Sequence, residues 1–251
     1  MTIPKGRCTL LNNSVTILDI VLLYLIYQIR QGLSSKLNQE KPTKRTYNSS
    51  RRKEQARQTR LQIVEAARKL FAERGYSGAT IEAIAQEAGV SAETVYATFG
   101  NKRAILSKLV DVSIVGDDEP VPLMQRSGPR AVQQEKDQYR QIKLFARDIQ
   151  EIMERMAPIF EIMRVAAKTE PDISEMLQHI LENRVHGMRE FITYLIANGP
   201  LQENITPDEA AETVWAVSSA EVYSLLTIDR GWSSEQYGQW LAMMLTKLLL
   251  K

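Results

Sequence analysis

Residues 75–102 carry the signals of two short helices joined by a tight turn. The hydroxyl of Thr80 can accept a hydrogen bond from one of the free backbone N–H groups that begin a helix. The apolar residues that follow are spaced as on one buried helical stripe: Ile81, Ile84, Ala85 and Ala88. Gly89 suits the left-handed conformation that ends a helix, and Ser91 can cap the next one. The segment therefore predicts a helix-turn-helix.

The second helix is expected to begin at Ala92, with Val95 and Phe99 facing the core because they lie four residues apart. In helix-turn-helix proteins the first residues of this helix enter the major groove of DNA and face base edges. Here those residues are Ala92, Glu93, Thr94 and Tyr96. A third helix should follow the turn at Gly100 and open with Lys102, where free N–H groups and a cation suit a DNA phosphate.

Several motifs at fixed spacing in this region resemble the tetracycline-repressor-like (TetR) family of transcriptional regulators. They are Ile63-Val-Glu-Ala-Ala-Arg-Lys-Leu-Phe-Ala-Glu-Arg-Gly-Tyr76, Thr80-Ile-Glu-Ala-Ile-Ala85, Ala88-Gly-Val-Ser91, Val95-Tyr-Ala-Thr-Phe99 and Asn101-Lys-Arg-Ala-Ile-Leu106. The resemblance implies that Thr94, Tyr96 and Lys102 hold the DNA backbone. It also places Ala92 and Glu93 over base edges, where acidic Glu93 either reads a cytosine amino group or points away. The DNA-binding residues expected in this segment are Thr80, Ala92, Glu93, Thr94, Tyr96 and Lys102.

Charge is divided unevenly along the chain. Residues 1–106 hold 17 Lys and Arg against 8 Asp and Glu, whereas residues 107–251 hold 15 against 22. A basic half that coincides with the helix-turn-helix favours a nucleic-acid partner, although an ordinary solvated surface can show the same asymmetry. Motif and charge together predict DNA binding.

Residues 37–60 contain eight Lys and Arg, two Glu and almost no apolar residues, which predicts a flexible segment without a core. A basic arm before a DNA-binding bundle can reach phosphates or the minor groove. The alternative is a merely soluble linker. If the arm binds DNA, the expected contacts are the basic residues nearest the bundle: Arg51, Arg52, Lys53 and Arg57.

Residues 1–50 form an atypical extension, with a strongly apolar segment at residues 15–29. A membrane span needs about 20 such residues, and Asp19 interrupts this shorter run. The small-residue cleavage site of a signal peptide does not follow it. Three interpretations remain: a membrane tether, an additional amphipathic helix packed on the body, or an upstream region included by too early a start. The last is favoured because the extension lies outside the family pattern, and a membrane partner is disfavoured.

From residue 130 onward the chain is helical in pattern, without the alternation typical of strands. Helices are predicted over residues 131–156, 158–168, 172–198, 207–228 and 234–250. The loop at residues 116–129, rich in Pro, Gly and Asp, separates this body from the DNA-binding domain at residues 51–112 and is a candidate hinge. The sequence thus predicts an all-α fold, with a helix-turn-helix bundle followed by a ligand-sensing and dimerisation domain at residues 130–251.

The last two predicted helices begin at the capping boxes Thr206-Pro-Asp-Glu209 and Ser233-Ser-Glu-Gln236. Both helices are apolar on more than one face, so they need a partner besides the chain's own core. In the TetR family the final two helices pair with their copies, which implies a homodimer that reads a palindromic site. The residues expected at the dimer interface are Val214, Val217, Trp240, Leu241, Met244, Leu245 and Leu248.

Methionine and aromatic residues recur in the body: Phe145, Met153, Met156, Phe160, Met163, Met176, Met188, Phe191, Tyr194 and Trp215. Such side chains adapt to irregular apolar ligands, but at helical spacing they more often form ordinary core. The resemblance favours a pocket for a hydrophobic small-molecule effector. Arg164, His179 and Tyr194 are candidate polar contacts, although surface or core roles are the plainer interpretation.

Enzyme chemistry and cofactors find no support in the sequence. Cys8 is the only cysteine, which excludes an intramolecular disulfide, and His179 and His186 lie too far apart on a helix to share a metal. Phosphate-binding glycine loops and the Gly-x-Ser-x-Gly motif do not occur. We therefore expect a cytoplasmic, homodimeric TetR-like repressor without metal or cofactor. It would leave a palindromic operator on double-stranded DNA when a ligand binds.

Overall fold

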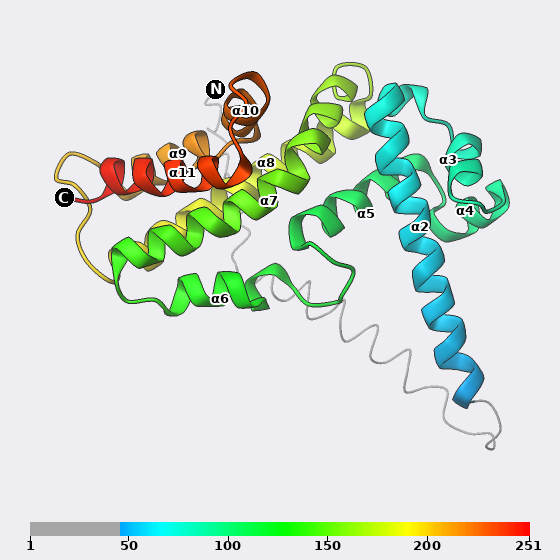
Figure 1. The fold of residues 1–251 in the computed structure, drawn as a ribbon, viewed down its shortest axis with the longest axis horizontal. Coiled ribbons are helices and arrows are strands. Elements are labelled where there is room, and N and C mark those ends of the chain that lie inside the picture. The colour runs from blue at the N-terminus through cyan, green and yellow to red at the C-terminus, as the bar shows by residue number, and fades with distance from the viewer. Residues whose placement is uncertain (1–45) are drawn as a thin grey trace, which may run out of the picture. The chain divides into compact units, whose positions relative to one another are not determined.

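The computed structural model describes residues 46–251, and every regular element within them is helical (Figure 1). The α-helices are α2 (Thr46–Gly78), α3 (Ile81–Glu87), α4 (Ala92–Phe99), α5 (Lys102–Val115), α6 (Ser127–Gln134), α7 (Gln138–Ala166), α8 (Pro171–Ile196), α9 (Pro207–Val217), α10 (Ala220–Ser224) and α11 (Ser234–Leu249). A 3-10 helix, η1 (Leu123–Gln125), and a π-helical turn, η2 (Leu225–Asp229), complete the set. The predicted all-α fold is confirmed.

Helix α2 bends at Gly75, whose φ of 70° and ψ of 172° interrupt the helical conformation. Glycine adopts this conformation without the steric cost that a side chain brings. The helix includes residues 46–60, so the prediction of a flexible segment there is wrong. Ion pairs one turn apart support such an exposed helix, as between Arg57 and Glu54 at 3.1 Å.

Lys53–Lys251 form one compact unit, and the first turns of α2 belong to a second unit, Met1–Arg52. The expected domain boundary at residue 50 therefore falls inside α2. The apolar segment at residues 15–29 lies outside the described residues, as does the start of the basic arm. Among residues 46–251, no helix is long and apolar enough to cross a membrane.

Helices α3, α4 and α5 gather around the C-terminal half of α2 (Figure 1). Each helix contributes a fully buried side chain to their core: Phe71, Ile84, Val95 and Leu109. The three short helices begin at the expected caps, which are Thr80, Ser91 and Asn101. Gly89 has the expected left-handed conformation, with φ of 67°. The helix-turn-helix predicted from the sequence is thus present.

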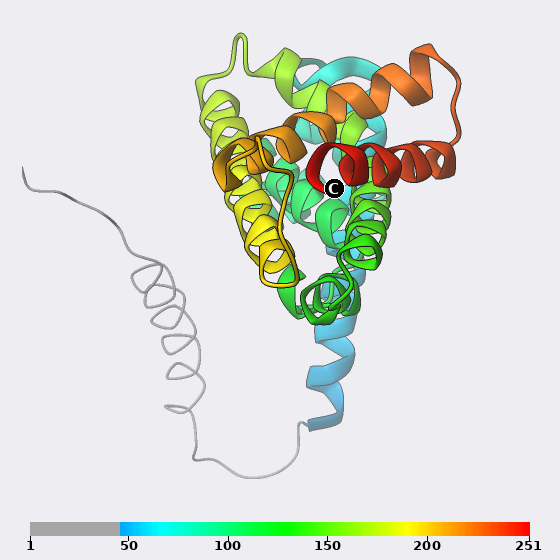
Figure 2. The same cartoon turned by 90° about the vertical axis from the view of Figure 1, so that its left-hand side faces the viewer.

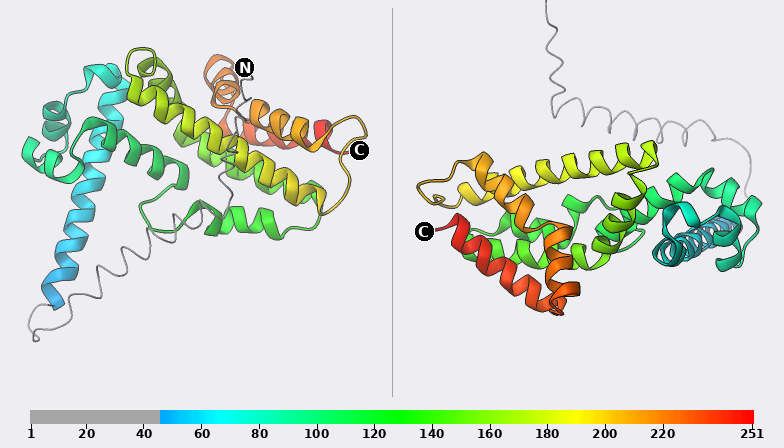
Figure 3. Two further views of the ribbon diagram at one scale, coloured as in Figure 1. Left: turned by 180° about the vertical axis from the view of Figure 1, so that it is seen from behind. Right: turned by 90° about the horizontal axis from the view of Figure 1, so that it is seen from above.

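Helices α7 and α8 run antiparallel and are joined by a short turn. Helix α6 lies along the opposite side of this pair from α9, α10 and α11 (Figures 2 and 3). Helix α7 contacts α5, α6, α8, α10 and α11. Its buried face includes Ile142, Met156 and Met163, which have no exposed surface. Through this helix the DNA-binding bundle and the body share one continuous core.

Three predicted helix boundaries in the body are wrong. Residues 135–137 separate α6 from α7, and the Asp137 side chain caps α7 by accepting a hydrogen bond from the Arg140 backbone. Helix α7 then continues through Pro158, which is exposed and removes only one backbone donor. The helix predicted over residues 207–228 is broken where Ser219 caps α10. The two predicted capping boxes are both formed.

Candidate nucleic-acid interface and effector cavity

Helix α4 presents its N-terminal half to solvent while its opposite face is anchored in the core. Val95 has no exposed surface, whereas the side chain of Tyr96 is 49% exposed. The Ser91 hydroxyl accepts the Thr94 backbone N–H at 3.2 Å and lies 3.1 Å from the Thr94 hydroxyl. Ala92 is half-buried and packs against the core. The functional groups that α4 exposes to solvent therefore belong mainly to Glu93 and Tyr96.

Glu93 is fully exposed in the first turn of α4. Hydrogen bonds from its own backbone N–H and from Ser91 lower the pKa of its carboxyl. An anion at this position is stabilised by the positive end of the helix. The carboxylate therefore stays ionised, and its contact with a cytosine amino group stays a prediction beside the alternative that it points away from DNA.

Lys102 and Thr80 are both engaged within the bundle. The Lys102 ammonium donates a hydrogen bond to the Tyr76 carbonyl at 2.7 Å and lies 4.3 Å above the centre of the Tyr76 ring. Partial burial lowers the pKa of Lys102. An ammonium has three donors, so this arrangement leaves donors for a phosphate. Thr80 uses its hydroxyl to accept the Ala83 backbone N–H at 3.1 Å.

Arg51, Arg52 and Lys53 are exposed along the first turns of α2. None of their side chains forms an ion pair within residues 46–251. They lie on a helix and not on the flexible arm that the composition suggested. Their contact with DNA stays a prediction.

An apolar cavity of about 510 Å³ lies between α5, η1, α6, α7 and α8. Its lining includes most of the predicted pocket residues: Phe145, Met153, Met156, Phe160, Met176, Met188, Phe191 and Tyr194. Met163 and Trp215 are not in the lining, so the prediction that these two residues line the pocket is wrong. Met163 is fully buried in the core, and Trp215 packs against the Arg184 guanidinium at 5.5 Å. Helical spacing alone does not say which side of a broad apolar stripe borders a cavity.

Most of the polar groups in the cavity wall were not predicted from the sequence. The lining includes Asp111, Asp148, His179, Asn183, Arg184 and Glu190. Asp148 lies three residues after Phe145, so helical periodicity places both on one face, a signal that the sequence did contain. Arg164 instead forms an ion pair with Glu221 and is absent from the lining.

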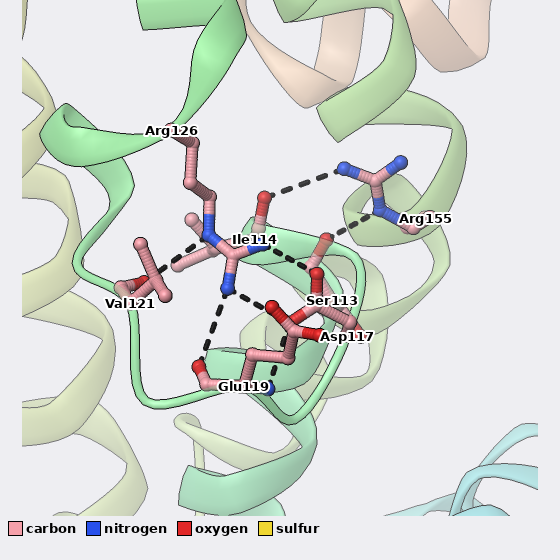
Figure 4. Close-up of polar contacts among 7 residues, drawn as sticks. All are labelled: Ser113, Ile114, Asp117, Glu119, Val121, Arg126 and Arg155. Atoms are coloured by element: carbon pink, nitrogen blue, oxygen red, sulfur yellow. Dashed lines mark hydrogen bonds and ion pairs between the residues drawn. The ribbon is translucent and has the colours of Figure 1, made fainter.

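The loop after α5 is fastened by two arginines (Figure 4). Arg155 of α7 donates to the Ser113 and Ile114 carbonyls at 2.8 and 3.3 Å, where the last carbonyls of α5 lack helical partners. Arg126 pairs with Asp117 and donates to the Val121 carbonyl at 3.1 Å. Arg126 thus holds the loop predicted as a hinge through contacts within that loop, and Arg155 joins the end of α5 to the body. Movement of α7 would be transmitted directly to the end of α5.

The Asp117–Arg126 pair should make this loop sensitive to acid. Hydrogen bonding to Arg126 lowers the pKa of Asp117 to about 2. Because the pKa of Asp117 is lower in the folded state, the ion pair stabilises the loop fully at pH values above the ordinary carboxyl pKa of about 4. This stabilisation is lost as the pH falls through about 2. The contribution should be modest, since the pair is solvent-accessible.

We expect Arg126→Ala to return the Asp117 pKa towards about 4 in an NMR titration of the carboxyl carbon. Arg130→Ala is the control, and an unchanged Asp117 pKa in Arg126→Ala would contradict the pairing.

The expected dimer surface is only partly exposed. Val214, Leu241 and Leu245 have no exposed surface and belong to the chain's own core. The prediction that these three residues lie at a dimer interface is therefore wrong. Val217, Trp240, Met244 and Leu248 are half-buried and remain candidates. Three strongly exposed apolar residues of the same region were missed: Leu225 (53%), Ile228 (68%) and Met243 (46%). Two of them belong to the π-helical turn η2, which an ordinary helical repeat does not predict.

The DNA-binding bundle matches a known family. Residues 63–109 match the model of the bacterial regulatory proteins, tetR family. Residues 63–109 of this chain are therefore a DNA-binding domain of the tetR type. The HTH-type transcriptional regulator TtgR of Pseudomonas putida is 43% identical over 61 residues, which are 24% of this chain and 29% of TtgR. The chain thus matches less than a third of the length of this curated TetR-family relative.

Solved structures extend the similarity of fold to the body. SmeT, in its complex with triclosan, aligns with a TM-score of 0.61 and 24% identity, over 77% of this chain and 92% of SmeT. NalD, described as the secondary repressor of the MexAB-OprM multidrug efflux pump in Pseudomonas aeruginosa, aligns with a TM-score of 0.58 and 22% identity. That match covers 78% of this chain and 98% of NalD. At these identities the TetR-like similarity of the body concerns the fold.

Proposed function

We propose that this TetR-family chain is a transcriptional repressor that binds a palindromic operator as a homodimer and releases it when a hydrophobic small molecule occupies the body. The observation that carries the proposal is the exposed N-terminal half of α4, held on a fully buried Val95. A helix anchored on one face and open on the other can enter a major groove without disturbing its core.

Homodimerisation is supported by the exposed apolar residues Leu225 and Ile228 of η2 and Met243 of α11. Large apolar side chains left open to solvent can mark a protein interface. A two-fold dimer would present two α4 helices, and palindromic half-sites are read about 34 Å apart. A second copy of the chain therefore fits both the surface and the expected operator.

Release by an effector is supported by the position of the cavity. Its wall contains Ser107, Val110 and Ile114 of α5 as well as residues of α7 and α8. A ligand that favours one arrangement of these helices would bias α5, and α5 follows the recognition helix directly. The triclosan complex of SmeT concerns a protein of similar fold and is compatible with such a site.

The proposal predicts two different effects within the DNA-binding bundle. The double substitution Tyr96→Ala with Lys102→Ala should weaken binding to every DNA sequence roughly tenfold or more, because backbone contacts are lost. It should also reduce the salt dependence of binding, with a log–log slope smaller by about 1 for each phosphate contact removed. Substitution of Glu93 by Gln should instead change the preferred sequence. Selection from random duplexes, followed by gel-shift titration, measures both effects.

Lys168→Ala provides a control, since this exposed lysine lies outside the bundle, in the turn between α7 and α8. Lys102 also contacts Tyr76, so the thermal unfolding of each variant must be shown to resemble that of the unaltered chain. If folded variants bind DNA with unchanged affinity, salt dependence and sequence preference, α4 is not the recognition helix.

A further inference from the structure

Asp148 lies in the wall of the cavity with an unpaired carboxylate oxygen. Its Oδ2 is fully buried and has no hydrogen-bond partner among the described residues. Its Oδ1 is 3.6 Å from a terminal guanidinium nitrogen of the exposed neighbour Arg147, a distance too long for a hydrogen bond. Burial raises the pKa of Asp148. A buried carboxylate oxygen without a donor is unfavourable, and such exceptions call for an explanation.

The surrounding residues hold this carboxylate in place. A Cβ at Gly128 of α6 would lie only 2.6 Å from Oδ2, so the carboxylate fills space that any side chain at position 128 would need. Phe145, one turn earlier on α7, stacks on Phe191 of α8 with ring centres 3.8 Å apart and planes at 12°. Both rings line the cavity together with Asp148. The Asp148 carboxylate is thus set beside an aromatic pair, in a wall whose other carboxylates are Asp111 and Glu190.

The cation in the wall, Arg184, already has acceptors. One of its terminal nitrogens donates to the Trp215 carbonyl at 3.2 Å and to the Ser218 carbonyl at 3.1 Å, at the end of α9. Its guanidinium also lies 5.5 Å from the centre of the Trp215 ring. Oδ2 of Asp148 has no such partner, and a carboxylate oxygen can only accept a hydrogen bond.

We propose that the cavity binds an apolar molecule carrying one protonated amine, whose N–H donates to the carboxylate of Asp148. A charged N–H donor is the strongest partner for a buried carboxylate, and aromatic faces tolerate a nearby cation. The volume of about 510 Å³ lies in the range of small-molecule sites. This inference names the chemical class of the effector and rests on the proposed function of the cavity.

The experiment compares three ligands of nearly equal shape on the full chain by isothermal titration calorimetry: phenylbutylamine, phenylbutanol and phenylbutyric acid. We expect the amine to bind most tightly. Asp148→Asn keeps the shape of the side chain and removes its charge, so it should weaken the amine roughly tenfold to a hundredfold. The alcohol should change by no more than about twofold. The trimethylammonium analogue, which lacks an N–H donor, should bind more weakly than the amine.

Glu151→Gln is the matched control, because it removes an exposed carboxylate from the same helix but outside the cavity lining. It should leave the order of the ligands unchanged. The inference is overturned if the acid binds most tightly, if none of the three binds, or if Asp148→Asn leaves the amine affinity intact. The order of ligands on the unaltered chain needs no variant and decides the matter if Asp148→Asn does not fold. DNA binding measured without ligand tests the proposed function separately.

Discussion

Leu225→Asp combined with Ile228→Asp should convert the proposed dimer into a monomer and abolish tight binding to the proposed operator. Both side chains are among the most exposed apolar groups of the described residues, at 53% and 68%. In a dimer interface each charge would be buried without a partner, which is strongly unfavourable. Loss of the second recognition helix removes bivalent binding, which is worth roughly a hundredfold to ten-thousandfold in affinity. Analytical ultracentrifugation and gel-shift titration measure the two effects.

Val121→Asp is the control for this experiment. Val121 is also exposed and apolar, but it lies in the loop between α5 and η1, away from η2 and α11. It should leave the sedimentation coefficient and the operator affinity unchanged. A double variant that still sediments as a dimer would place the interface elsewhere on the body.

Phe71→Ala should lower the free energy of unfolding by about 3–5 kcal/mol. The side chain has no exposed surface, and its ring centre lies 5.4 Å from that of Tyr76. Removing it leaves a cavity at the point where α2 meets the short helices of the bundle. Since Tyr76 also supports Lys102 through its carbonyl and its ring, DNA binding should weaken together with stability. Guanidinium chloride unfolding measured by circular dichroism gives the change.

Gln62→Ala, at an exposed position of the same helix, should change the free energy of unfolding by less than about 0.5 kcal/mol. A Phe71→Ala variant with the stability of Gln62→Ala would show that the bundle core is not packed as described. A variant that is destabilised but binds DNA normally at low temperature would show that DNA binding does not depend on the contact between Tyr76 and Lys102.

The bundle could be predicted closely because its signals are local. Each of Thr80, Ser91 and Asn101 caps a helix through its own side chain, three residues from the N–H that it accepts. Gly89 ends α3 because its conformation is set by its own backbone. Such features do not depend on distant parts of the chain, so a single sequence contains them.

The body was predicted less closely because its boundaries depend on tertiary contacts. Pro158 looks like a helix end, yet α7 continues through it with buried residues on both sides, Met156 and Ile159. Packing of this long apolar face outweighs the loss of one backbone hydrogen bond. The π-helical turn η2 likewise has no strong local signal.

The same division applies to the candidate sites. The sequence by itself determined the helix-turn-helix, the all-α class and most of the cavity lining, because caps and apolar periodicity are properties of neighbouring residues. Only the tertiary structure decided that Val214, Leu241 and Leu245 belong to the core and that Lys102 is held by Tyr76. It alone also left Oδ2 of Asp148 buried without a donor. Burial and pairing depend on which helices meet, and that is fixed by contacts between residues far apart in the chain.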